Sequence, residues 1–149
     1  MDDYEDGEKE KEMYSNIQNT FDQLDKAPYK LLEFHQGKKL KNIFAIINDL
    51  LNEIIENHLL DVHFKKLDTV MFTADVMRKL CVQEKFFQEE LRKSGVMANI
   101  LDSTEIMISY IDHNAAKISK TPFKMEDYVQ KILILLINFV TQNKKNQKY

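Results

Sequence analysis

The chain contains few residues that interrupt a backbone: its 149 residues include three glycines, two prolines, one cysteine and no tryptophan. So few turn formers argue against a many-stranded fold and favour long helices. The lone cysteine, Cys81, cannot form an intramolecular disulfide, and its place on an apolar stripe predicts a buried thiol. The longest apolar run, residues 132–137, is far shorter than the ~20 residues of a membrane span, so we expect a core helix there.

Neither sign of charge is in large excess, since 24 acidic and 21 basic residues give a net charge of −3. A protein that wraps a nucleic-acid duplex needs a basic face, and this composition does not support one. The N-terminal residues are acidic and lack the apolar stretch of a secretory signal, so we expect an intracellular protein. The length fits a single domain.

The apolar residues mark out one domain between two polar segments. Residues 1–12 mix acids with lysines and offer little to bury, which predicts a flexible acidic tail. Residues 142–149 predict a polar, basic tail. In residues 13–141 apolar side chains recur at the i, i+3, i+4 and i+7 spacing of amphipathic helices. This pattern predicts an all-α bundle of about six or seven helices.

The sequence of residues 13–55 predicts two helices separated by a turn. Residues 13–24 carry a thin apolar stripe that is terminated by Pro28. Residues 29–34 predict a short apolar turn closed by Gly37, whose permissive backbone suits a helix end. Residues 40–55 follow the helical spacing for about four turns, and their wide apolar face predicts a central position in the bundle.

Residues 64–102 predict two or three short amphipathic helices joined by tight turns. Leu67 and its apolar neighbours are spaced for one helix face, and Val76 and its neighbours are spaced for a second. The apolar stripe then ends at Ser94 and Gly95, a typical helix stop.

Two further helices complete the predicted bundle. Ser103 is placed to cap a helix that ends near residues 112–114. The last helix is predicted to open at Thr121 and Pro122, an N-cap followed by proline at the first helical position. Its body, residues 128–140, is apolar nearly all round, which predicts a helix enclosed by others.

Reactive chemistry has no clear signature in the sequence. Nucleophile elbows, glycine-rich phosphate loops and paired carboxylate motifs are missing, so we predict no enzyme activity and no cofactor. His58 and His63 are five residues apart, which on a helix separates them by about 140°, whereas helical zinc sites use i and i+4. We therefore predict no metal site, although a small helical metalloenzyme that uses these two histidines stays an alternative.

A protein partner is the better-supported expectation. Phe86 and Phe87 are adjacent, so they cannot both face one narrow stripe; either the buried face is wide or one ring is exposed as an anchor for an acidic, hydrophobic peptide. Met77 fits either an adaptable binding surface or the core. Together with the lysines around them, the candidate partner-binding residues are Lys65, Lys66, Met77, Lys79, Lys85, Phe86 and Lys93.

Three features follow one another in residues 64–101: Lys65-Lys66-Leu67, an amphipathic stretch over residues 76–81, and Ser94-Gly95-Val96-Met97. The order of these features resembles that in the Iws/Spn family of transcription elongation factors, whose helical repeat is similar to the N-terminal domain of TFIIS. The similarity covers about residues 45–140. The resemblance implies ARM/HEAT-like antiparallel hairpins and a nuclear adaptor without catalysis. It also implies binding of a segment of a histone-chaperone elongation factor of the Spt type, in a groove between helices.

A different helical interaction module stays open as an alternative. In a Bcl-like bundle that binds an amphipathic helix in a groove, residues 128–140 would form the central helix. Neither reading requires a small-molecule substrate, a nucleic acid or a membrane.

Overall fold

The computed structural model describes residues 2–57, 64–118 and 125–148, and within these ranges it contains eight α-helices, one short 3-10 helix and no strand. The prediction of an all-α bundle is confirmed, with more helices than the six or seven expected. No helix among the described residues combines the length and apolarity of a membrane span. In chain order the elements are α1 (Asp2–Lys26), η1 (Pro28–Lys30), α2 (Leu31–Gln36), α3 (Lys39–Glu56), α4 (Phe64–Gln83), α5 (Lys85–Lys93), α6 (Val96–Ile118), α7 (Met125–Val140) and α8 (Lys144–Gln147).

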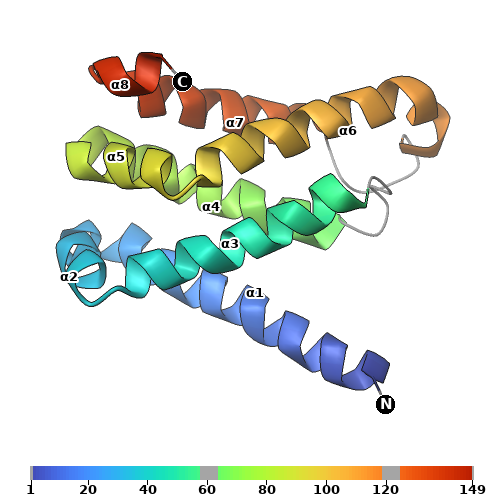
Figure 1. Ribbon diagram of the computed structural model, residues 1–149, viewed down its shortest axis with the longest axis horizontal. Helices are drawn as coiled ribbons and strands as arrows, with labels where there is room; N and C mark the ends of the chain where they lie inside the picture. Colours follow the sequence, from blue (N-terminus) through green and yellow to red (C-terminus); the bar gives the residue numbers. More distant parts are fainter. Residues whose placement is uncertain (1, 58–63, 119–124, 149) are drawn as a thin grey trace.

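The helices repeat in groups of three. A long, a short and a long helix follow one another in α1–α2–α3 and again in α4–α5–α6, and α7–α8 begins a third group. Packing partners are three helices apart, because α4 lies between α1 and α7, α3 packs along α6, and α8 packs on α5. The short helices α2, α5 and α8 all lie at one end of the molecule (Figure 1). The helices therefore form a stack with a period of three helices.

Helix α4 forms the middle layer of the stack and is buried over a wide arc. Its buried positions run from Leu67 and Ala74 on one side to Val76 on the other, about half the circumference at 100° per residue. The predicted division of this stretch into separate helices before Gln83 is therefore wrong. The two apolar faces belong to one helix that packs against neighbours on both sides.

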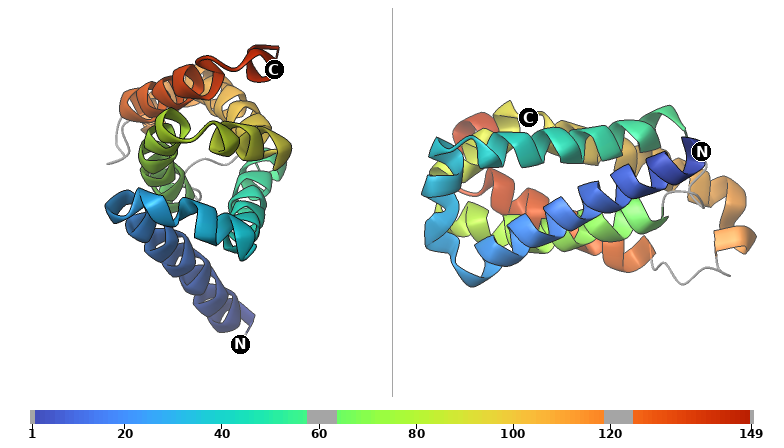
Figure 2. Two further views of the ribbon diagram at one scale, coloured as in Figure 1. Left: turned by 90° about the vertical axis from the view of Figure 1, so that its left-hand side faces the viewer. Right: turned by 90° about the horizontal axis from the view of Figure 1, so that it is seen from below.

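Helix α1 begins at Asp2, so the structure has a helix where a flexible tail was predicted over residues 1–12. Lysine and glutamate are good helix formers, and Lys66 of α4 forms an ion pair with Glu10 at 3.0 Å. The N-terminal half of α1 extends away from the other helices (Figure 2, left). The helix ends before Pro28, as predicted.

The helix end predicted at Gly37 is confirmed, since Gly37 is the residue that caps α2, whereas the helix start predicted at Ser103 and the helix end predicted near residues 112–114 are wrong. At the end of α2 the left-handed residue is Lys38, with φ of 62°, whereas Gly37 has a negative φ. Helix α6 runs without a break through Ser103, whose buried hydroxyl donates to the carbonyl of Ile100, and past residues 112–114 to Ile118. A hydroxyl bonded to its own helix offers no cap, which explains the missing helix start at Ser103.

The predicted break at Ser94 and Gly95 is confirmed. Gly95 has φ of +80°, a backbone conformation that side chains with a Cβ rarely adopt, and it separates α5 from α6. The Ser94 hydroxyl donates to the carbonyl of Leu91 across the end of α5. The turn therefore depends on one glycine.

Helix α7 is not enclosed by other helices, contrary to the prediction. Its buried stripe consists of Tyr128, Ile132, Leu135 and Phe139. By contrast, the side chain of Leu133 is 53 % exposed and that of Ile137, on the same helix, is 61 % exposed. The acids Glu126 and Asp127 lie in its first turn, where the helix dipole favours negative charge. The predicted N-cap at residues 121 and 122 lies outside the described residues.

The C-terminal residues predicted as a tail form α8, which a buried polar network holds against α5. Asn146 is fully buried, and its Nδ2 donates to the carbonyls of Gln88 (3.2 Å) and Phe139 (2.8 Å). Arg92 Nη1 donates to Asn146 Oδ1 at 2.9 Å, and Gln88 Oε1 accepts a hydrogen bond from Asn143. Because buried polar groups are costly when unpaired, this network fixes the position of α5.

Replacing Asn146 with alanine removes the hydrogen bonds from its side chain to the carbonyls of Gln88 and Phe139 and the one from Arg92, so we expect Asn146→Ala to lower the free energy of unfolding by about 1–3 kcal/mol. Urea denaturation measures this change. Lys145→Ala is the matched control, because Lys145 is exposed on the same short helix and should change stability by less than about 0.5 kcal/mol. Equal stability of the two variants would contradict the structural role of the network.

Candidate functional site

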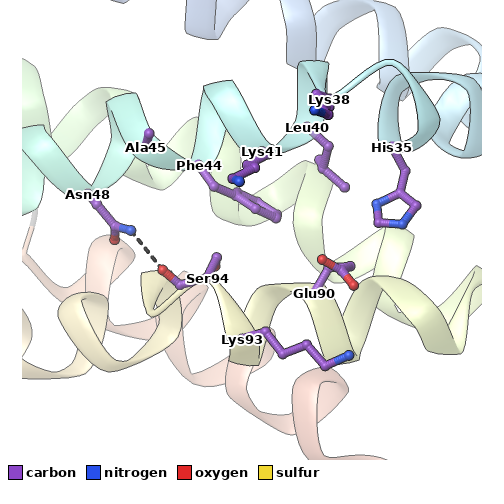
Figure 3. Close-up of a pocket in the computed structure, with 10 residues that line it drawn as sticks. All are labelled: His35, Lys38, Leu40, Lys41, Phe44, Ala45, Asn48, Glu90, Lys93 and Ser94. Atoms are coloured by element: carbon purple, nitrogen blue, oxygen red, sulfur yellow. Dashed lines mark hydrogen bonds between the residues drawn. The ribbon is translucent and has the colours of Figure 1, made fainter.

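A pocket of about 580 Å³ lies between the first and second helix groups. One wall comes from the end of α2 and the start of α3, and the other comes from the end of α5 (Figure 3). The residues that line it are His35, Lys38, Leu40, Lys41, Phe44, Ala45, Asn48, Glu90, Lys93 and Ser94. The pocket is therefore a groove between two consecutive layers of the stack.

The inner part of the pocket is apolar. Leu40 and Phe44 are buried side chains of α3, and the Phe44 ring packs against Phe87 of α5 with centroids 5.9 Å apart. Ala45 lies on the exposed surface of α3 at the pocket wall and leaves space because its side chain is small. A ligand side chain placed there would contact an aromatic and aliphatic surface.

The rim is mainly positive. Three exposed lysines, Lys38, Lys41 and Lys93, line the pocket together with a single acid, Glu90. Two of the lysines lie at the N-terminus of α3, where the helix dipole already adds positive potential, and the first turn of α3 contains no acid and no side-chain cap. Among the described residues none of these lysines takes part in an ion pair. The pocket therefore favours an anionic group.

Two asparagines hold the walls together at one end. Asn48 Nδ2 donates to the Ser94 carbonyl at 2.9 Å (Figure 3), and Asn99 Nδ2 donates to Asn48 Oδ1 at the same distance. These bonds connect α3 to the α5–α6 turn. Because both walls are fixed, the pocket exists without a ligand, which lowers the entropic cost of binding.

The structure brings only part of the predicted partner-binding set to this pocket. Lys93 lines it, and Phe86 lies close by, half-buried, with its ring centroid 5.4 Å from that of His35. Lys85 is exposed at the edge of a smaller pocket near Cys81. Of the two readings of the adjacent phenylalanines, the structure therefore has one buried ring, Phe87, and one partly exposed ring.

The remaining candidates lie elsewhere. Met77 is fully buried in the core, and Lys66 is buried between Glu10 and Glu53. Lys65 lies over the Tyr14 ring at 4.8 Å, and Lys79 forms an ion pair with Asp25 at 2.7 Å, both on the α1 side of α4. The lysines of α4 therefore stabilise the packing of α1 and do not face the pocket.

Sequence reasoning missed the α2–α3 wall, His35, Lys38 and Lys41. The available signal was the run KKLK at residues 38–41, which places several positive charges at the start of the clearest helix. Its relation to Lys93 depends on the stacking of the two helix groups, and no local pattern contains that information.

Reactive groups are few in the part of the chain that the structure describes. It contains no cluster of three or more metal-ligating side chains, and His58 and His63 lie outside the described residues. Burial raises the pKa of the Cys81 thiol to about 12, so this side chain stays protonated near neutral pH. The buried thiol predicted from the sequence is confirmed.

Comparisons with known proteins add no relative: no family model, curated protein or solved structure matches this chain. Function is therefore inferred from the residues that line the pocket. The resemblance described above supplies the expectation about the class of partner.

Lys66 connects three helices through its ammonium group. It contacts Glu10 of α1 at 3.0 Å and Glu53 of α3 at 3.3 Å, and the lysine itself is 7 % exposed. The hydrogen bond from Lys66 lowers the pKa of Glu10 below its usual value of 4.5. A carboxyl whose pKa is lower in the folded state stabilises the fold above its unfolded pKa, and this contribution is lost as the pH falls.

We therefore expect Lys66→Met to reduce the loss of stability between pH 7 and about pH 3. At pH 7 the substitution should lower the free energy of unfolding by on the order of 1 kcal/mol or less, because both carboxylates are about half exposed. Urea denaturation at both pH values gives the comparison. Lys145→Met removes an exposed lysine and should keep the wild-type pH dependence; if Lys66→Met keeps it as well, the ion pairs do not stabilise the fold.

Proposed function

We propose that this protein is a non-enzymatic interaction module that binds an acidic peptide segment in the pocket between α2–α3 and α5. The observation that carries the proposal is the combination of three lysines on the rim with an apolar inner wall. An acidic segment with one aliphatic or aromatic side chain matches both features. The side chain enters against Phe44 and Ala45, and the acids face the lysines.

The size and rigidity of the pocket support a peptide anchor. Its volume lies within the ~300–1,000 Å³ of typical ligand sites, enough for one or two large side chains. Binding energy in such grooves comes mainly from the buried anchor, whereas the rim charges steer association and select the partner. Glu90 limits where an acid can lie, because it opposes negative charge on the α5 wall.

The resemblance to the Iws/Spn family supports a particular partner. It covers the α5–α6 turn, and Ser94 of that turn lines the pocket. We therefore propose a segment of a histone-chaperone elongation factor of the Spt type as the ligand. In this proposal the protein is a nuclear adaptor in transcription elongation.

The Bcl-like alternative is less well supported. It requires residues 128–140 to form an enclosed central helix, whereas α7 exposes Leu133 and Ile137. The pocket is also formed by α2, α3 and α5 and does not involve α7.

Filling the pocket should abolish partner binding without unfolding the protein. Ala45 is exposed in the middle of α3 and arginine is a good helix former, so Ala45→Arg should leave stability unchanged while its side chain occupies the apolar wall. With the immobilised full-length chain in nuclear extract, we expect wild type to retain the Spt-type elongation factor and Ala45→Arg to retain at least about tenfold less, a loss of about 1.4 kcal/mol.

Charge reversal separates the pocket from the rest of the surface. Lys41→Glu should also weaken capture of the elongation factor, whereas Lys11→Glu makes the same charge change on α1, outside the pocket, and should not. Immunodetection of the elongation factor and circular dichroism of each variant give the readout. Absence of the factor from the wild-type sample, or equal capture by Ala45→Arg, would refute the proposed function.

A further inference from the structure

The two ends of the helix stack differ in polarity. At one end, the exposed residues of α1 from Glu8 onward are all polar, which is the character of a capping helix in a solenoid. At the other end, α7 is the outer helix of the stack that begins with α1 and α4. Its exposed surface includes Leu133 and Ile137, one helical turn apart.

These two residues lie on the side of α7 that faces away from α4. At 100° per residue, Leu133 and Ile137 are about 140° to 180° from Tyr128 at the start of the buried stripe. The buried stripe packs on α4, which is the main neighbour of α7. The exposed pair therefore lies where the next helix of the stack would pack.

The charges around this surface suit a second copy of the same helix in antiparallel orientation. The exposed acids Glu126 and Asp127 lie at the start of α7, and the exposed lysines Lys144 and Lys145 follow its end in α8. A twofold axis near residue 135 places Leu133 of each copy beside Ile137 of the other. The same axis brings the acidic end of one α7 toward the basic end of the other, so that unlike charges approach.

We propose that the protein forms a twofold-symmetric dimer through α7, with Leu133 and Ile137 at its centre. Each copy contributes the same surface, as in isologous interfaces. The contact joins two helix stacks end to end and leaves the pocket between α2–α3 and α5 open in both copies. The dimer is independent of the proposed function, because the pocket and α7 share no residue.

Sedimentation equilibrium of the full chain tests the dimer. We expect the wild type to dimerise with a dissociation constant of about 1 mM or tighter, and the double variant Leu133→Lys/Ile137→Lys to stay monomeric. Leu32→Lys is the matched control, because Leu32 is 52 % exposed on α2, in the first helix group, and should leave dimerisation unchanged. A monomeric wild type, or a double variant that still dimerises, would overturn the proposal.

Charge exchange tests the antiparallel orientation. Reversing the acids (Glu126→Lys/Asp127→Lys) should weaken dimerisation at least about tenfold at low salt, and so should reversing the lysines (Lys144→Glu/Lys145→Glu). A chain with all four reversals should recover the wild-type dissociation constant, because each copy again offers unlike charges to the other. Failure of this recovery would contradict the antiparallel arrangement.

Discussion

The burial of α4 on two sides is the constraint on which the rest of the fold depends. About half its circumference is apolar or small and buried, so a single neighbour cannot cover it. Helix α1 covers one side and α7 covers the other, which orders the chain as a stack with a period of three helices. Each large apolar side chain buried in this way stabilises the fold by about 1.5–3 kcal/mol. The short helices then collect at one end, where α2 and α5 contribute to the walls of the pocket.

Helix α5 has nine residues, which is too short to be stable alone. Phe87 and Leu91 bury its inner side, and the carboxamides of Gln88 and Asn146 attach it to α8. Glu90 and Lys93 are left on the side that faces α3. The geometry of the pocket therefore depends on a polar network that lies on the opposite side of α5 from any ligand.

The parts of the fold that a local pattern determines were predictable from the sequence. In α3, seven apolar residues from Leu40 to Ile54 are buried along the predicted stripe, because a single wide stripe has one interpretation. Gly95 marks a helix end because the backbone there needs a positive φ. The prediction for α4 was wrong for the opposite reason. In the sequence, one helix with two apolar faces has the same pattern as two helices with one apolar face each.

Tertiary contacts explain the other differences. Asn146 is polar and close to basic residues, which predicts a solvated tail, and only its hydrogen bonds to α5 and α7 make it a buried residue. The pocket also depends on tertiary contacts that no local sequence pattern contains. Lys93 was a candidate from the sequence, but Lys38 and Lys41 face it only because α3 and α5 are in adjacent layers.

The lysines of this protein fall into two groups with different consequences. Lys66, Lys79 and Lys131 each have a carboxylate within 3.0 Å, and each joins α4 to a neighbouring helix. The three pocket lysines have no such partner among the described residues.

Unpaired surface lysines are common, but three around one concavity at a helix N-terminus repel one another. Two like charges about 10 Å apart repel by about 0.4 kcal/mol in water. The repulsion grows when an apolar ligand group displaces water from between them. An acid carried by the same ligand reverses the sign of that change, which is the physical basis of the proposed preference for ligands in which an apolar side chain and a carboxylate are adjacent.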